Sequence, residues 1–391
     1  MSEYQYYEFA AVDRPLTAQQ QAELRDLSSR ATISSGSFIN EYHWGDLKGD
    51  PLDWMQRYFD AHVYSANWGS CRLMLRLPRA ALEAAELAPF IAPATESSGF
   101  GPVFSAVETA AHWILDWDFH DDSGEFERFW SSDDGPGWMG RLLPLRDELL
   151  RGDLRPLYLG WLARANRGEF GSDDLEPPLP AGLGALSPAQ QALADFLLID
   201  PDWLVAAAVS SPALAATGLE DANLELWLQE QTEAELRARV RLLLEGRAME
   251  AERSVRRAYV AWQHSRQAMP AAPERRRVVQ IVDQAMAARA RRLEGERVER
   301  EAKAAKLQAE YSAMLDRLAQ EAPQVWQEID STVKRGTGSA YEQGFTLLQT
   351  LAAALKQAGR QEDFRLGLTR LLERHGHRPA WMKRLTKAGW V

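Results

Sequence analysis

Two carboxylates and an imidazole occupy every second position near the end of the segment 112–122. If this segment is a strand, its alternation places Asp116, Asp118 and His120 on one face, opposite an apolar face rich in tryptophan. Such a set could hold a hard divalent cation or supply an acid–base pair. The alternative is a half-buried strand whose polar face meets water, because the sequence identifies no further ligands. A metal-dependent hydrolase is therefore one functional hypothesis.

Aromatic and polar side chains gather between residues 40 and 68. Tyr58 and His62 are four residues apart on a helix predicted to begin at Asp50-Pro51, so they would share a face of it. With Trp44 and Trp68 they could form an aromatic surface for a partner, since tryptophan is enriched at interface hot spots. The alternative is core packing, in which each ring is buried and its polar tip keeps one hydrogen bond.

The charge of the chain is split along the sequence. Residues 1–230 hold 15 Lys/Arg and 36 Asp/Glu, whereas residues 231–391 hold 30 and 20. One alternative is that the oppositely charged parts attract each other, for example an acidic segment near 185–230 and the arginine-rich helix. The other is that the arginines bind nucleic acid or an acidic protein partner. These arginines are Arg275, Arg276, Arg277, Arg289, Arg291 and Arg292.

The motifs of common enzymes are absent from the sequence. It has no glycine-rich phosphate loop, nucleophile elbow, paired-cysteine motif or His-Glu-x-x-His motif. Cys71 is the single cysteine, which excludes an internal disulfide and a multi-cysteine metal site. His375 and His377 flank Gly376 at a predicted helix end, where cationic side chains complement the helix dipole, so we do not interpret them as metal ligands. We therefore expect no cofactor, and a non-enzymatic role is favoured.

The presence of only one cysteine indicates a reducing compartment. No apolar run of about 18 residues predicts a membrane span, and the polar, aromatic start of the chain lacks the pattern of a secretory signal. We expect a cytoplasmic protein that neither enters nor crosses a membrane.

An α+β domain must position the first two candidate sites. Aromatic and β-favouring residues predict strands at 4–12, 37–44, 71–78 and 112–119. Helical periodicity predicts helices at 17–30 and from 51 to about 67. This order predicts a small, mostly antiparallel sheet with helices on one face.

An all-helical region must position the arginines. The acidic Pro/Gly-rich stretch 168–184 is interpreted as a linker, and residues 274–322 predict one long, partly exposed helix. Its apolar residues, among them Ile281, Leu293 and Leu307, are too sparse for a regular heptad seam. The tail predicts helical hairpins of the TPR or solenoid type. The predicted domains are 1–124 (α+β), 125–184 (helical or irregular, with the linker), 185–272 (helical), 273–323 (long helix) and 324–391 (helical hairpins).

Two parts of the sequence show a resemblance to known proteins. Tyr6-Tyr7-Glu8-Phe9, Asp13-Arg14-Pro15-Leu16, Ala66-Asn67-Trp68-Gly69 and the strand ending at Pro78 resemble an uncharacterised bacterial family. The tail, with Tyr341, Gly359-Arg360, Phe364 and His377-Arg378-Pro379, is similar to the C-terminal helical module of bacterial SWIM zinc-finger proteins. The zinc finger itself has no counterpart here. The resemblance implies a bacterial protein with an accessory role.

The leading hypothesis is therefore an accessory or scaffold protein that binds other proteins in a bacterial multi-component system. Missing catalytic motifs, the long exposed helix and the charge split motivate it. Nucleic-acid binding through the arginines and metal-dependent hydrolysis at the Asp/His strand are the alternatives.

Overall fold

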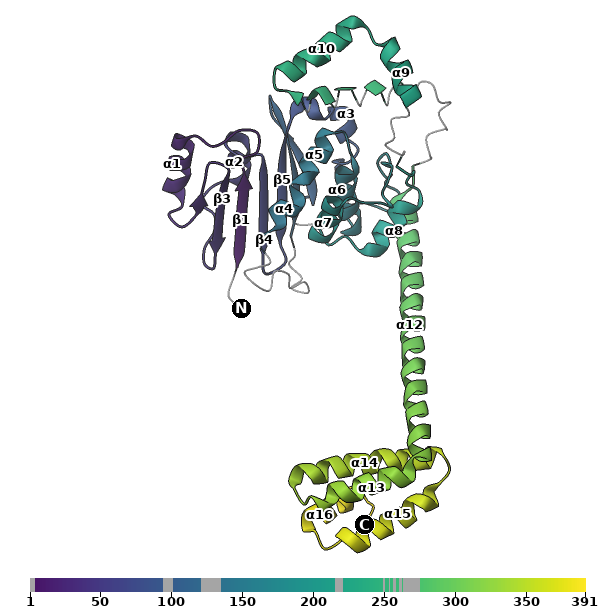
Figure 1. Cartoon of the computed structure of the whole chain (residues 1–391). Helices are drawn as coiled ribbons and strands as arrows, with labels where there is room; N and C mark the ends of the chain where they lie inside the picture. The colour runs from purple at the N-terminus through teal and green to yellow at the C-terminus, as the bar shows by residue number, and fades with distance from the viewer. Residues whose placement is uncertain are drawn as a thin grey trace. The chain divides into compact units, whose positions relative to one another are not determined.

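The computed structural model describes residues 4–93, 101–120, 135–214, 221–248, 250–252, 254–255, 258–259, 262 and 275–391 (Figure 1). The chain divides into two compact units, Met1–Ala290 and Arg291–Val391. Each unit has its own hydrophobic core. Residues 121 and 122, the end of the segment that carries the predicted Asp/His set, lie outside the described residues.

A seven-stranded sheet forms the amino-terminal part of the first unit (Figure 1). Its spatial order is β2-β3-β1-β4-β5-β7-β6, and all paired neighbours are antiparallel. The prediction of an α+β region with an antiparallel sheet is thus confirmed. The strands are β1 (Gln5–Ala10), β2 (Thr32–Ile33), β3 (Ser37–Tyr42), β4 (Ala61–Ala66), β5 (Cys71–Pro78), β6 (Phe104–Glu108) and β7 (His112–Phe119).

One face of the sheet packs on helices to form the main core of the unit. Leu73, Leu75 and Trp117 contribute to this core from alternate positions on β5 and β7. The helix α6 is buried on all sides, and a Cβ at Gly160 would lie 2.6 Å from the side chains of Phe104 and Trp117. Glycine therefore lets α6 approach the sheet. The helices that contribute to this core are α4 (Trp138–Leu142), α5 (Pro144–Leu150), α6 (Arg155–Asn166), α7 (Pro188–Phe196) and α8 (Pro201–Val209).

The opposite face of the sheet has a smaller core at the β1–β3 end. Phe9 and Phe38 pack there against Trp54, with ring centroids 5.0 and 4.8 Å from the indole. Helices α1 (Ala18–Leu27) and α2 (Pro51–Arg57) contribute to this core. Both begin as the sequence predicts, because Thr17 and Asp50 cap them with side-chain oxygens.

The helix predicted from residue 51 to about 67 is wrong in its second half. The structure ends α2 at Arg57 and forms β4 from Ala61. The Asp60 N–H donates to the Ala10 carbonyl, and β4 then pairs with both β1 and β5. Tyr58 and His62 therefore do not share a helix face. Two sheet neighbours satisfy the backbone groups of β4 as a helical extension would have done, so the tertiary pairing, not the local period, decides the structure here.

The remaining elements of the first unit are short. Among the described residues they include the 3-10 turn Arg79–Ala81 and helices α3 (Ala84–Leu87), α9 (Asp221–Glu230) and α10 (Glu233–Leu244). Cys71 is fully buried, and its Sγ donates to the Phe196 carbonyl at 3.0 Å.

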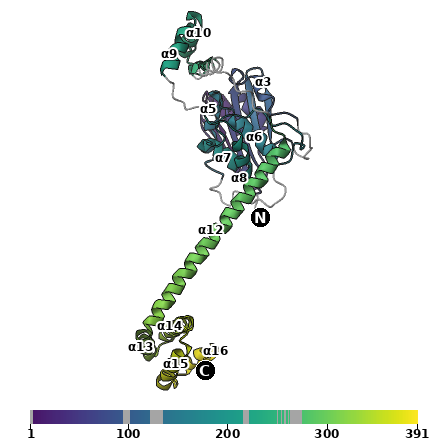
Figure 2. The ribbon, with the colours of Figure 1, turned by 90° about the vertical axis from the view of Figure 1, so that its right-hand side faces the viewer.

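A 43-residue helix, α12 (Val278–Gln320), leads from the first unit into the second, as the sequence predicts (Figure 2). The second unit adds α13 (Ala322–Lys334), α14 (Gly338–Gln357), α15 (Gln361–His375) and α16 (Pro379–Lys387). Ile329, Leu348 and Trp381 are fully buried in its core. The prediction of packed helices in the tail is confirmed.

Across the described ranges, no helix is both long and apolar enough to cross a membrane.

Candidate functional site

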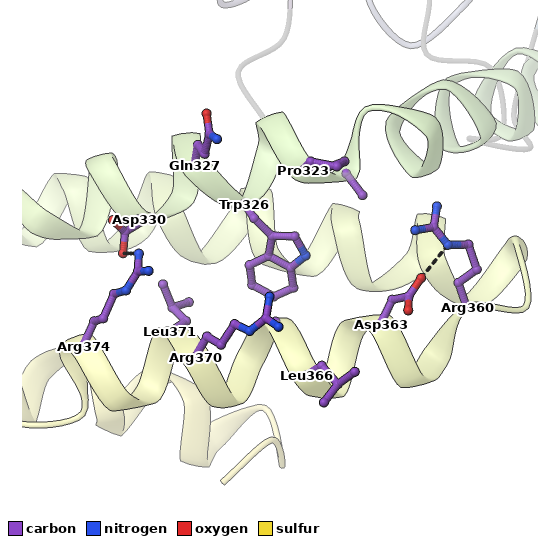
Figure 3. A pocket seen from close by; sticks show the side chains of 12 residues that line it. Pro323, Trp326, Gln327, Asp330, Arg360, Asp363, Leu366, Arg370, Leu371 and Arg374 are labelled. Carbon is purple, nitrogen blue, oxygen red and sulfur yellow. Dashed lines mark hydrogen bonds and ion pairs between the residues drawn. The ribbon is translucent and has the colours of Figure 1, made fainter.

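The second unit contains a groove between α13 and α15 (Figure 3). Pro323, Trp326 and Asp330 line it from one stripe of α13 with helical spacing, and the lining residues of α15 follow the same spacing. The groove has a volume of about 550 Å³. It belongs entirely to the second unit. Its α15 wall consists of Asp363, Leu366, Gly367, Arg370, Leu371 and Arg374.

The floor of the groove is apolar. Trp326 reaches from α13 toward α15 (Figure 3), where a Cβ at Gly367 would lie 2.3 Å from the indole ring. Glycine in the middle of a helix costs about 1 kcal/mol relative to alanine, and this contact explains why it is present. Ala322 and Leu371 are buried beside the ring, and Leu366 is 59% exposed. The floor therefore combines the packed indole ring of Trp326 with the solvent-exposed side chain of Leu366.

The rim of the groove is basic. Arg360 is held by Asp363 at 2.6 Å and by the Ala319 carbonyl at 2.8 Å. Arg370 has no hydrogen-bond or ion-pair partner among the described residues. Arg370 and Trp326 line the same groove from α15 and α13 (Figure 3). The groove thus offers one uncommitted cation beside an apolar floor.

An acid at the far end of the groove fixes a second arginine. Asp330 accepts from His375 Nε2 at 3.0 Å and lies 3.4 Å from Arg374 Nη1. Burial raises the pKa of Asp330, but the hydrogen bonds from His375 and Arg374 outweigh burial, and the net pKa is lowered. Asp330 is therefore an anion that orients Arg374. α15 ends at His375, and Gly376 follows as its C-cap, which agrees with the helix-end interpretation of these histidines.

Of the predicted Asp/His set, Asp116 and Asp118 occupy alternate positions of β7, and His120 directly follows the end of the strand. Arg72 of β5 donates to both oxygens of Asp116, at 2.9 and 2.6 Å, and lies 3.7 Å from Asp118. Burial raises the pKa of Asp116, and the hydrogen bonds from Arg72 offset part of this. Because both Asp116 oxygens accept from a guanidinium, this carboxylate is committed to an ion pair.

The other two members of the set face a smaller hollow. His120 Nε2 lies 3.2 Å from Asp118 Oδ1. The two side chains border a cavity of about 270 Å³ together with Arg167, whose guanidinium donates to the His120 carbonyl. In the part of the chain that the structure describes, no group of three or more His, Cys, Asp or Glu is arranged to hold a metal.

The predicted aromatic set does not form one surface. Trp44 is 81% exposed and Trp68 is 36% exposed, whereas Tyr58 is buried and donates to Glu23 at 2.6 Å. His62 is fully buried on β4 and stacks on Phe9 at 3.9 Å. Two of the four residues thus pack in the interior, and two reach water.

The predicted arginines have separate environments. Arg276 is buried and makes hydrogen bonds of 2.8 and 2.7 Å to Glu176, which also accepts from Tyr158. Arg277 pairs with Asp173 at 2.6 Å, and Arg275 donates to the Glu176 carbonyl. The acidic segment interpreted as a linker therefore supplies the partners of all three. Further along α12, Arg292 pairs with Glu296, while Arg289 and Arg291 are exposed.

The sequence interpretation did not identify the groove. Two signals were available in the predicted helical hairpins of the tail. One is Gly367 within a helical segment, and the other is the pair Arg370 and Arg374 on the face that also carries Leu371. Their meaning depends on Trp326, which is 41 positions from Gly367 in the chain. Only the packing of α13 on α15 brings these residues together.

Comparison of the chain with family models, curated proteins and solved structures finds no match. The resemblance of the tail to the helical module of SWIM zinc-finger proteins stays a prediction.

Proposed function

We propose that this is an accessory protein whose second unit binds an acidic, amphipathic helical segment of a partner protein in the groove between α13 and α15. The observation that carries the proposal is the uncommitted Arg370 beside the Trp326 floor. An amphipathic helix recognises such a groove through apolar anchors at helical spacing. Asp or Glu beside those anchors would pair with Arg370.

Charge supports this choice of partner. Residues 351–391 hold nine Lys/Arg and three Asp/Glu, so a segment rich in acids meets a complementary field. Tryptophan and arginine are also the residue types most enriched among interface hot spots. The single cysteine indicates a reducing compartment, and we place this role in the bacterial cytoplasm.

The test is a selection of phage-displayed peptides of about 15 residues, a length that gives a marginal helix, on the full chain. We expect enriched peptides to carry apolar residues at helical spacing, flanked by Asp or Glu. In fluorescence anisotropy, Arg370→Glu should weaken such a peptide about tenfold or more, because an attraction becomes a repulsion. Trp326→Ala should also weaken it, because the floor is lost.

Arg365→Glu is the matched control. Arg365 lies on α15 outside the groove, is exposed, and pairs with Glu362. The same change of charge there should leave peptide affinity within about twofold, since distant exposed charges are screened. Peptides without acidic residues, or equal binding to the Arg370 and Arg365 variants, would refute the proposal. If no acidic peptide bound, and a single-stranded oligonucleotide bound instead with an affinity that fell with Arg370→Glu, nucleic acid would replace the peptide as the partner of this groove.

A further inference from the structure

Exposed apolar side chains recur every seventh residue along α12. They are Val279, Met286, Leu293, Leu307 and Met314, with exposures of 39, 57, 50, 66 and 40%, and Arg300 occupies the intervening position. In the first part of the helix, the buried residues Val278, Ile281 and Ala285 lie on the opposite side. The exposed series is therefore a separate face of α12, which we call the seam.

A second series, offset by four residues, completes the seam. It contains Ala290, Ala304 and Tyr311, with Asp283, Arg297 and Leu318 at the other positions. Alternating steps of four and three residues are the spacing by which one helix packs against another in a coiled coil, so this exposed face follows a heptad spacing that the sequence interpretation did not recognise. The seam thus has large side chains in one column and mostly small or polar ones in the other.

We propose that the seam binds the seam of a second copy of this chain, with the two α12 helices antiparallel and the twofold axis between residues 298 and 299. This register places Leu293 of one copy opposite Ala304 of the second copy, and Leu307 opposite Ala290. Met286 faces Tyr311 of the second copy. In these three layers a large side chain meets a small one or a ring, so they can fill without voids. The remaining layers pair Val279 with Leu318, Met314 with Asp283 and Arg300 with Arg297 of the second copy.

Charges beside the seam agree with this register. The positions that precede the second series face each other in an antiparallel pair, which sets Arg289 against Glu310 of the second copy and Glu296 against Lys303 of the second copy. Both contacts join opposite charges. On the other flank Glu294 faces Glu301 of the second copy, but each already bonds to Arg297 of its own helix, at 2.7 and 2.6 Å. The two central layers place Arg297 opposite Arg300 of the second copy, and Glu294 and Glu301 supply the carboxylates that neutralise Arg297.

A parallel pair fits the same residues poorly. It would place Ala304 against Ala304 of the second copy, which leaves space between small side chains, whereas arginines face each other at the centre in either orientation. On its flanks Arg289 would approach Glu294 of the second copy, but Glu296 would approach Glu301, a like-charge contact that the antiparallel pair replaces by Glu296 against Lys303. Complementarity thus selects the antiparallel orientation.

Sedimentation equilibrium of the full chain tests the proposal. We expect a species of twice the 44.0 kDa chain mass. Leu307→Lys should shift the chain toward the monomer. The control Val298→Lys changes another exposed residue of α12, 51% accessible and outside the seam, and should leave the dimer intact.

Exchanging the charges at positions 296 and 303 tests whether the two α12 helices are antiparallel. Glu296→Lys creates two Lys–Lys contacts in the antiparallel dimer and should raise its dissociation constant about tenfold; adding Lys303→Glu should restore it. In a parallel dimer Glu296→Lys would instead meet Glu301 and strengthen association. A wild-type chain that stays monomeric at about 100 μM, far above the micromolar range expected of a seam of this length, would overturn the proposal. So would stronger association of the Glu296→Lys variant. Neither result bears on the groove between α13 and α15.

Discussion

His62 is a neutral imidazole inside the sheet core. Its ring is fully buried, Nδ1 donates to the Glu8 carbonyl at 3.1 Å, and Nε2 has no hydrogen-bond partner among the described residues. Burial lowers the pKa of His62 to about 3, although the hydrogen bond to Glu8 opposes the change. Arg72 also disfavours the charged form, and Asp118 favours it. The His62 imidazole thus contributes to core packing and remains a titratable group.

This pKa predicts how the stability of the first unit depends on pH. Between about pH 3 and 6.5 the unfolded chain binds a proton at His62 and the folded chain does not, so stability falls as pH falls through this range. From pH 7 to pH 5 the loss is about 2 kcal/mol. Urea unfolding at several pH values should show it, and His62→Asn, which keeps an N–H donor, should flatten the slope.

The exposed His377 supplies the control for this experiment. His377→Asn should leave the pH slope of the first unit unchanged. An equal slope in the wild-type and His62→Asn chains would show that His62 is protonated in the folded state, contrary to its burial.

Among the helices, two interior glycines have opposite roles. A Cβ at Gly295 of α12 would meet nothing within 4 Å, whereas at Gly367 of α15 it would lie 2.3 Å from Trp326. We predict that Gly295→Ala stabilises the second unit by about 0.5–1 kcal/mol, because alanine is the better helix former. Gly367→Ala should destabilise it by about 1–3 kcal/mol, because the indole must shift.

Chemical denaturation of the two variants, followed by far-UV circular dichroism, measures both effects. The two substitutions are chemically identical, so each is the control for the other. A stabilising Gly367→Ala would mean that Trp326 does not rest on α15, and the floor of the groove would then be wrongly assigned.

Elements could be predicted from the sequence where one local signal dominates. Thr17 and Asp50 cap the helices that follow them, and the alternation of β5 and β7 is strong enough to fix both strands. β4 could not be predicted, because Phe59 and Val63 continue the helical period of α2 while packing into cores on opposite faces of the sheet. The groove depends on Trp326 meeting Gly367, a contact between distant parts of the chain that no local pattern encodes.

At the scale of the whole molecule, fold and charge divide the chain differently. The charge changes sign near residue 230, whereas the two compact units meet at residues 290 and 291. Arg276, from the basic part of the sequence, is buried against Glu176 inside the first unit. Arg276 therefore serves internal packing, while the exposed Arg275 and Arg277 bond to the same acidic segment. Such a contact joins residues 100 positions apart, so composition alone could not assign it.

Because each of the two units has its own hydrophobic core, we predict that the units unfold in separate transitions. Leu115 is fully buried in the core of the first unit and Leu348 in that of the second. Each Leu→Ala change should cost about 2–5 kcal/mol in its own unit and leave the other unit unaffected. Differential scanning calorimetry should therefore show two transitions, one shifted by each variant.

A single transition that both variants shift equally would contradict this prediction. It would mean that the two cores unfold as one cooperative body.

The single cysteine, Cys71, lets the rate of thiol modification report on the opening of the core of the first unit. Because the Cys71 thiol is fully buried and occupied by the Phe196 carbonyl, a thiol reagent can reach it only when the core between β5 and α7 opens. The rate of alkylation then reports the frequency of that opening. The second unit contains no thiol, so the signal comes from the sheet core alone, in the unmodified chain.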